Sequence, residues 1–305
     1  MNALLQISES SLEDWSTLFP TPAVIYDSAA FLALNSHKCE RLVLLTGHDK
    51  GINFGLAAGL RGGTLHAPFS APFCTVETSG CVSPEQLKQF IIAVKNYCIT
   101  NRYDIEISMP PACYSFYDFN AIFRETGFSR LLSDLNFHVP LHAIPKMTPT
   151  ARNKAARARR EGFQFEECPA DMLDEVYATI KTNRDFRGYP LRMTLDDLRA
   201  TLPIASGRLF SIRSVCADMA AAAVIYRPCR NAYQLIYWGH IDPTPGVMNL
   251  LATELFSTLA AEKQTSILDL GPASDRGQIL PGLARFKTSL GAISTEKPTF
   301  CINPE

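Results

Sequence analysis

The nine cysteines of this 305-residue chain lack the spacing of a metal site. No Cys-x-x-Cys pair occurs, and no cysteine stands beside a histidine at metal-ligand spacing. Scattered cysteines are typical of reduced thiols that pack as small apolar side chains. We therefore expect a reducing compartment and no metal.

Long apolar runs and an excess of one charge are also missing. No apolar run approaches the roughly 18 residues of a membrane span, and residues 1–15 lack the basic and apolar regions of a signal peptide. The formal net charge is −1, so the surface as a whole does not attract DNA. The sequence predicts a cytoplasmic protein with no membrane span and no DNA partner.

The pattern of apolar residues predicts an α/β (α+β) fold in two domains, 1–147 and 148–305. In each half, strands forming a meander are followed by a helix, a strand, a helix and a strand. The hydrophobic content of 47% is sufficient for two cores. The expected strands lie at 41–47, 52–60, 64–69, 103–109, 131–141, 163–168, 208–215, 219–227, 232–239, 266–271 and 292–302, and the expected helices at 84–100, 114–126, 149–161, 170–186, 194–202, 245–262 and 279–289.

Four stretches of the second half carry a resemblance. They are "ARNKAARARREGFQFEE" (151–167), "RDFRGYPLRMTLDDLRATLP" (184–203), the strand, long helix and Asp-x-Gly strand at 233–271, and "GLARFKTSLGA" (282–292). In this order and spacing the chain resembles the Fem family of peptidoglycan-bridge aminoacyltransferases and the related acetyltransferases of the GNAT superfamily. In the first half, "HAPFSAPFC" (66–74) is similar to the Pro-Phe-rich loop of the family.

The resemblance implies two GNAT-like domains, each a mostly antiparallel mixed sheet flanked by helices, with the site in the cleft between them. It implies N-acyl transfer to a primary amine of a small-molecule acceptor, with acetyl-CoA or another acyl-CoA as donor. A Fem-like transferase that uses aminoacyl-tRNA on a cell-wall precursor is one alternative, and a non-catalytic binding module is another. The usual GNAT phosphate loop, Gln/Arg-x-x-Gly-x-Gly/Ala, is missing, and only Gly246 remains of it.

Lys287 is the first candidate catalytic residue. On a helix through 279–290, the residues Ile279, Leu283, Phe286 and Leu290 form one apolar stripe, which places Phe286 in the core and Lys287 at its half-buried border. A lysine there could stabilise a developing oxyanion, or simply cover the edge of the core. In the resembled family the Phe-Lys pair borders the acyl-donor channel, which implies that Phe286 contacts the donor.

Asp269 and Tyr237 are the other candidate catalytic residues. Asp269 lies among apolar residues of a strand, where an acid is costly unless it is paired or has a role. It could act as the general base for the acceptor amine, or it could order the loop that follows. Tyr237 stands near the end of its strand.

Two groups of residues are candidates for binding the donor. Arg157 and Arg160 stand together on the basic helix, where they could bind phosphate or form a solvated basic face. A second helix begins near Gly246 and Val247, and the free N–H groups at a helix start suit a pyrophosphate.

The acceptor is expected to meet aromatic and basic side chains. Arg187 and Tyr189 suit an anionic or aromatic ligand, although the same residues could form only a turn between two helices. Trp238 from the second half, with Phe69 and Phe73 from the first, would line the wall of the site.

Overall fold

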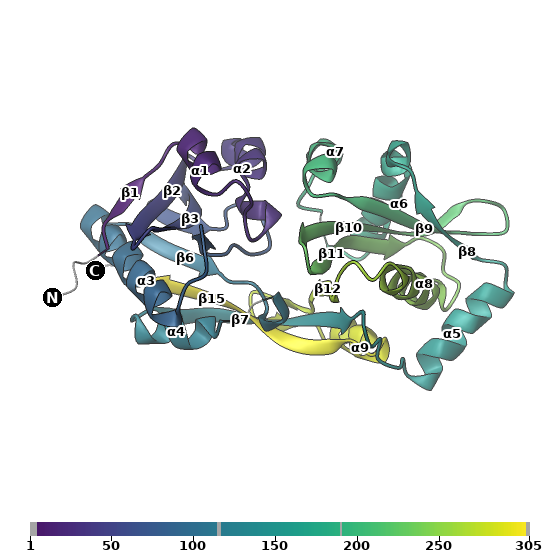
Figure 1. The fold of residues 1–305 in the computed structure, drawn as a ribbon. Coiled ribbons are helices and arrows are strands. Elements are labelled where there is room, and N and C mark those ends of the chain that lie inside the picture. Colours follow the sequence, from purple (N-terminus) through teal and green to yellow (C-terminus); the bar gives the residue numbers. More distant parts are fainter. Residues whose placement is uncertain (1–4, 115–116, 190, 303–305) are drawn as a thin grey trace. The chain divides into compact units, whose positions relative to one another are not determined.

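The computed structural model describes residues 5–114, 117–189 and 191–302, and the chain forms two compact units (Figure 1). Unit 1 runs to Asp134 and takes up the chain again from Glu296, and unit 2 is Leu135–Thr295. The expected boundary at 147/148 therefore differs from the observed division. None of the described helices is long and apolar enough to cross a membrane.

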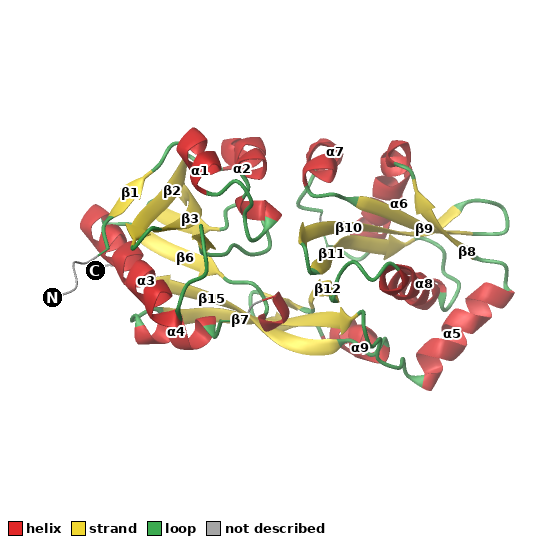
Figure 2. Ribbon diagram, viewed as in Figure 1, coloured by secondary structure: helices red, strands yellow, loops and turns green. Residues whose placement is uncertain are grey.

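Unit 1 is a mostly antiparallel sheet with helices on it (Figure 2). Its strands follow the order β1-β2-β3-β4-β6-β15, and among the described residues only β4 and β6 pair in parallel. A Ser83 capping box starts the helix that joins these two strands. The strands are β1 (Ile7–Glu9), β2 (Arg41–Asp49), β3 (Ile52–Arg61), β4 (Thr64–Ala67), β5 (Glu77–Thr78), β6 (Asp104–Ser108) and β15 (Ile293–Ile302), and the helices are α1 (Leu12–Leu18), α2 (Ala29–Asn35), α3 (Pro84–Asn101) and α4 (Phe119–Glu125).

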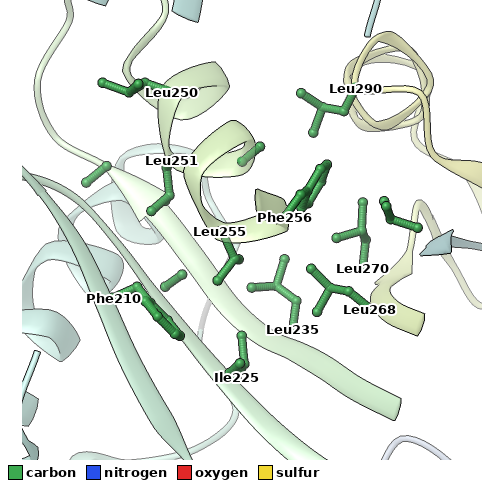
Figure 3. Close-up of a cluster of buried hydrophobic side chains, with 14 of the residues drawn as sticks. Phe210, Ile225, Leu235, Leu250, Leu251, Leu255, Phe256, Leu268, Leu270 and Leu290 are labelled. Carbon is green, nitrogen blue, oxygen red and sulfur yellow. The ribbon is translucent and has the colours of Figure 1, made fainter. Parts of the chain in front are cut away.

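Unit 2 has a sheet of the same kind, in the order β7-β12-β11-β10-β9-β8. In the part of unit 2 that the structure describes, only β11 and β12 pair in parallel. The apolar helix α8 covers one face and supplies Leu251, Leu255 and Phe256 to the core (Figure 3). The strands are β7 (Ser129–Pro140), β8 (Gln164–Cys168), β9 (Arg208–Arg213), β10 (Met219–Cys229), β11 (Ala232–His240), β12 (Ile267–Pro272), β13 (Ser274–Asp275) and β14 (Gln278–Ile279), and the helices are α5 (Pro149–Arg160), α6 (Leu173–Phe186), α7 (Leu195–Ile204), α8 (Val247–Ala261) and α9 (Pro281–Ser289).

The two halves of the chain exchange their last strands. In β7, residues 136–140 pair with β12 of unit 2, and in β15, residues 299–302 pair with β6 of unit 1. The carboxyl-terminal strand was expected to complete the second domain, and this expectation is wrong. Each sheet thus needs a strand from the other half of the sequence.

The expected strands and helices are present with small shifts at their ends, and the short elements before residue 41 were missed. Ile279, expected in a helix, lies in β14, because the helix begins only at Pro281. The helix expected from residue 114 begins at Phe119.

A pair of buried carboxyl groups holds the segment between α1 and α2. Asp27 and Glu77 are each only 2% exposed. The Thr75 N–H donates to Asp27 at 2.9 Å, the Thr75 hydroxyl lies 3.0 Å from Asp27 and 2.8 Å from Glu77, and the Ala23 N–H donates to Glu77 at 2.8 Å. Burial and the neighbouring Glu77 raise the pKa of Asp27 well above its usual value, and burial raises the pKa of Glu77. The pair therefore holds a proton that the unfolded chain releases near pH 4.

We expect the stability of unit 1 to fall as the pH rises from about 4. Between the unfolded pKa and the raised folded pKa, the folded chain binds more protons than the unfolded chain, and each pH unit in that window costs about 1.4 kcal/mol. Asp27→Asn supplies an amide N–H in place of the shared proton. Between pH 4 and 8 the melting temperature of this variant should therefore fall less than that of the parent protein. Asp171→Asn, at an exposed acid, is the control. An equally steep decline in Asp27→Asn would contradict the shared proton.

Candidate functional site

The parallel strands β11 and β12 separate part of the way along. They pair only from Ala232 opposite Ile267 to Gln234 opposite Asp269. Beyond this point each strand has an extra residue relative to its other neighbour. Ile236 is the extra residue of β11 in its pairing with β10, and Leu270 is the extra residue of β12 in its pairing with β7. Among the described residues, 235–240 of β11, here named the open edge, therefore have no partner in β12, although all of them except Ile236 still pair with β10 on the other side.

Lys287 binds the separated end of β12. Its Nζ donates to the carbonyl oxygens of Leu270, Gly271 and Pro272 at 2.7, 2.8 and 2.9 Å, and the residue is 2% exposed. Burial lowers the pKa of Lys287 to about 7, while the Asp269 carboxylate raises it. Three acceptors match the three N–H bonds of an ammonium group, which leaves none for an oxyanion.

The burial along α9 corrects the expected apolar stripe. Lys287 and Leu290 are buried, whereas Leu283 and Phe286 are both half-buried against the core. Lys287 is therefore buried in unit 2, not at the border of its core. We replace its expected catalytic role with a positioning role, because its donors hold β12.

Asp269 is a buried structural acid. Its carboxylate accepts hydrogen bonds from the Asn136 amide at 2.8 Å, the Gln234 amide at 2.9 Å and the Gly271 N–H at 2.8 Å, and the residue is 1% exposed. A substrate amine cannot reach an acid that is buried and bonded in this way, so the general-base role is not supported. Asn136 and Gln234 were missed by the sequence analysis because neither stands in a motif.

Tyr237 lies half-buried on the open edge, beneath an arginine. The Arg184 guanidinium carbon lies 5.1 Å from the centre of its ring. Burial raises the pKa of Tyr237. Hydrogen bonds from the backbone N–H groups of Met193 and Arg192 and the positive charge of Arg184 lower this pKa, but by less than burial raises it. The phenol therefore keeps its proton at neutral pH.

The end of α6 is tied to the end of β11. Arg187 donates to His240 Nε2 at 3.3 Å, and His240 Nδ1 lies 2.8 Å from the Asp242 carbonyl oxygen, so Nδ1 carries the ring proton. The Asn183 amide donates to the His240 carbonyl oxygen at 2.6 Å. Arg187 thus lies beside the end of the open edge, and Tyr189 is 49% exposed two residues further on. Their expected contact with the acceptor stays a prediction.

The start of α8 lacks a side-chain cap. Gly246 precedes it with φ +109°, and a Cβ there would lie 2.2 Å from the Lys154 carbonyl oxygen of α5. Only glycine permits this contact. Arg157 is on the side of α5 that carries Lys154, although it is paired with Glu161 at 2.7 Å.

Two of the expected donor contacts need correction. Arg160 lies opposite the buried face of α5 formed by Ala151, Ala155 and Ala158, so it points away from α8. The Val247 side chain is 1% exposed within the core, so it can offer a ligand only its backbone.

The aromatic residues divide in the same way. Trp238 and Phe286 pack together, half-buried, with ring centres 5.6 Å apart, so both stay candidates for contact with a ligand. Phe69 packs against Trp15 and Phe19, and Phe73 packs against Tyr26, in the core of unit 1. They are 7% and 0% exposed, so we remove them from the substrate site. The expected cleft between two domains stays a prediction.

We expect Lys287→Met to destabilise unit 2. The substitution keeps much of the length of the side chain but leaves three buried carbonyl oxygens without donors, which should lower the free energy of unfolding by about 3 to 5 kcal/mol. Denaturant unfolding measures this. Lys263→Met, at an exposed lysine after α8, should change it by less than about 0.5 kcal/mol. Equal stabilities of the two variants would contradict the positioning role.

Comparisons with known proteins support the fold. No family model and no curated protein matches the sequence. Among solved structures, the chain is similar to FemX, with a TM-score of 0.67 at 10% identity over 97% of this chain and 96% of that one. It is also similar to the C-terminal domain of a putative lysylphosphatidylglycerol synthetase from Agrobacterium fabrum, with a TM-score of 0.61 at 12% identity over 95% and 91%. A tandem GNAT protein from the clavulanic acid biosynthesis pathway matches with a TM-score of 0.52 at 10% identity over 99% of both chains. The chain thus has the mixed α/β, GNAT-like fold that the sequence predicts.

Proposed function

We propose that the protein is an N-acyltransferase that moves an activated acyl group to a primary amine at the open edge of β11. The separation of β11 from β12 carries this proposal. It leaves six residues of β11, among them Tyr237 and Trp238, unpaired with β12. An extended donor chain could form its own hydrogen bonds to the backbone of this strand. The parallel pair of unit 1 has no such region, because all four residues of β4 pair with β6.

Acyl-CoA is the donor that we propose first. The uncapped start of α8 at Gly246 and Val247 offers backbone N–H groups to a pyrophosphate, and Arg157 adds a positive charge on the neighbouring helix. The reaction depends mainly on holding the amine and the acyl group close together in the right orientation. The amine nitrogen bonds to the acyl carbon, the bond to the leaving sulfur breaks, and the thiolate takes a proton from Tyr237. The proton lost by the amine then restores the phenol.

Aminoacyl transfer is the second candidate. FemX and the lysylphosphatidylglycerol synthetase domain have higher TM-scores against this chain, 0.67 and 0.61, than the tandem GNAT protein, 0.52. In this reaction the same edge would receive the aminoacyl end of a charged tRNA, and Tyr237 would protonate a ribose oxygen.

Thermal melting with each donor separates the two candidates. Coenzyme A at 100 times its dissociation constant should stabilise the parent protein by about 2.7 kcal/mol, and acetyl-CoA with a panel of amines should release free thiol. A response to charged tRNA without one to coenzyme A would overturn the acyl-CoA proposal and support aminoacyl transfer. Binding without transfer from either donor would indicate a binding module.

We expect Tyr237→Phe to lower kcat by about 10² in a protein that stays folded. The variant keeps the ring beneath Arg184 and removes the hydroxyl, which supplies the proton to the leaving group and accepts the N–H groups of Met193 and Arg192. Tyr103→Phe, in unit 1, is the control and should turn over like the parent. A full rate in Tyr237→Phe would remove the phenol from the mechanism.

A further inference from the structure

Arg184 is a half-buried arginine without an acidic partner. Within the described part of the chain its guanidinium group makes no ion pair and no hydrogen bond, and it lies over the face of Tyr237. Burial lowers the pKa of Arg184, and only Tyr237 acts in the opposite direction. Taking a guanidinium group out of water without a counter-ion is costly.

Two other half-buried arginines of unit 2 have two carboxylates each, and a third, Arg227, donates to the neutral oxygens of Gln264 and Arg230. Arg208, with a 21% exposed side chain, binds Glu167 and Glu262, both within 2.8 Å. Arg213, with a 20% exposed side chain, binds Glu166 and Glu175, both within 2.8 Å. The fold therefore supplies acceptors, charged or neutral, to these three arginines, and among the described residues it supplies none to the Arg184 guanidinium group.

The surroundings of Arg184 are positively charged. Its charge acts on Lys287 and lowers the pKa of that amine. Arg192 acts on the same tyrosine as Arg184, and its own acidic contact is a loose, exposed one with Asp275 at 4.0 Å. The buried acid Asp269 already accepts from three donors. This region of the open edge therefore attracts an anion.

Arg184 is on the side of the sheet opposite α8. Tyr237 points to the α6 face beneath Arg184, and the next residue, Trp238, points to the opposite face, where it packs on Phe286 and the core beneath α8. The proposed donor phosphates belong at the start of α8, so a ligand held by Arg184 approaches the open edge from the other face. That face is left for the acceptor.

We propose that Arg184 binds an oxyanion of the acceptor, a carboxylate or a phosphate, close to the amine that is acylated. This proposal rests on the proposed function, since it takes the open edge as the place of transfer. The guanidinium fork would hold the oxyanion through two parallel hydrogen bonds while Tyr237 supports its face. The acceptor is then an anionic amine, not a simple alkylamine.

Anion binding tests the proposal without any assay of transfer. The melting temperature of the full chain is measured in inorganic phosphate and in acetate, each against chloride at equal ionic strength. At least one of the two should raise it, and the effective one identifies the class of oxyanion. Arg184→Gln should abolish this rise, and Arg184→Lys should weaken the binding about tenfold, because a point charge cannot form the fork. Arg230→Gln, at an exposed arginine, removes the same charge elsewhere and should keep the response.

Stability in chloride provides the second measurement. Arg184→Gln should melt at the same temperature as the parent or higher, because it removes an uncompensated buried charge. Arg213→Gln, which leaves two acids unpaired, should melt lower. If Arg184→Gln melts as low as Arg213→Gln, or responds to anions as the parent does, Arg184 is structural and the proposal is overturned. Anion binding at Arg184 without acyl transfer would instead refute the proposed function alone.

Discussion

The three hydrogen bonds from Lys287 to the carbonyl oxygens of β12 hold the rest of the candidate site in place. Gly271, with φ +74°, turns the backbone at the extra residue, so that three successive carbonyl groups gather around one point. Their partial negative charges would repel one another without a cation. Because α9 supplies that cation, the end of β12 can stay apart from β11, and the Asp269 carboxylate nearby balances the buried charge.

The same order of elements has different consequences in the two units. In unit 1 the parallel pair is complete, since β4 ends after four paired residues. In unit 2, β11 continues for six residues beyond its last pair with β12. A strand that continues beyond its partner offers backbone groups and alternate side chains to a ligand, whereas a completed pair offers neither. The difference in register, not the order of elements, makes unit 2 the candidate site.

Apolar periodicity predicted most of the long elements, because each of them buries one face against a core. It missed α1 and α2, which are seven residues long and depend on contacts distant in sequence, such as that of Asp27 with Thr75. The exchange of β7 and β15 left no local signal either. Lys287 was placed at the border because a stripe of apolar residues was assumed to face inward, and the assumption fails where buried carbonyl groups need a donor.

The charges of unit 2 distinguish structural groups from groups kept for a ligand. Lys287, Arg208 and Arg213 each have all the acceptors that their N–H groups need, so their burial is compensated within the fold. Arg184 is different, because the free protein bears the cost of its burial and gains only a contact with Tyr237. A fold that provides acceptors, charged or neutral, for its other half-buried arginines could have done so here. The missing counter-ion is therefore better explained as part of a ligand, and its place beside the open edge links that ligand to the group that is transferred.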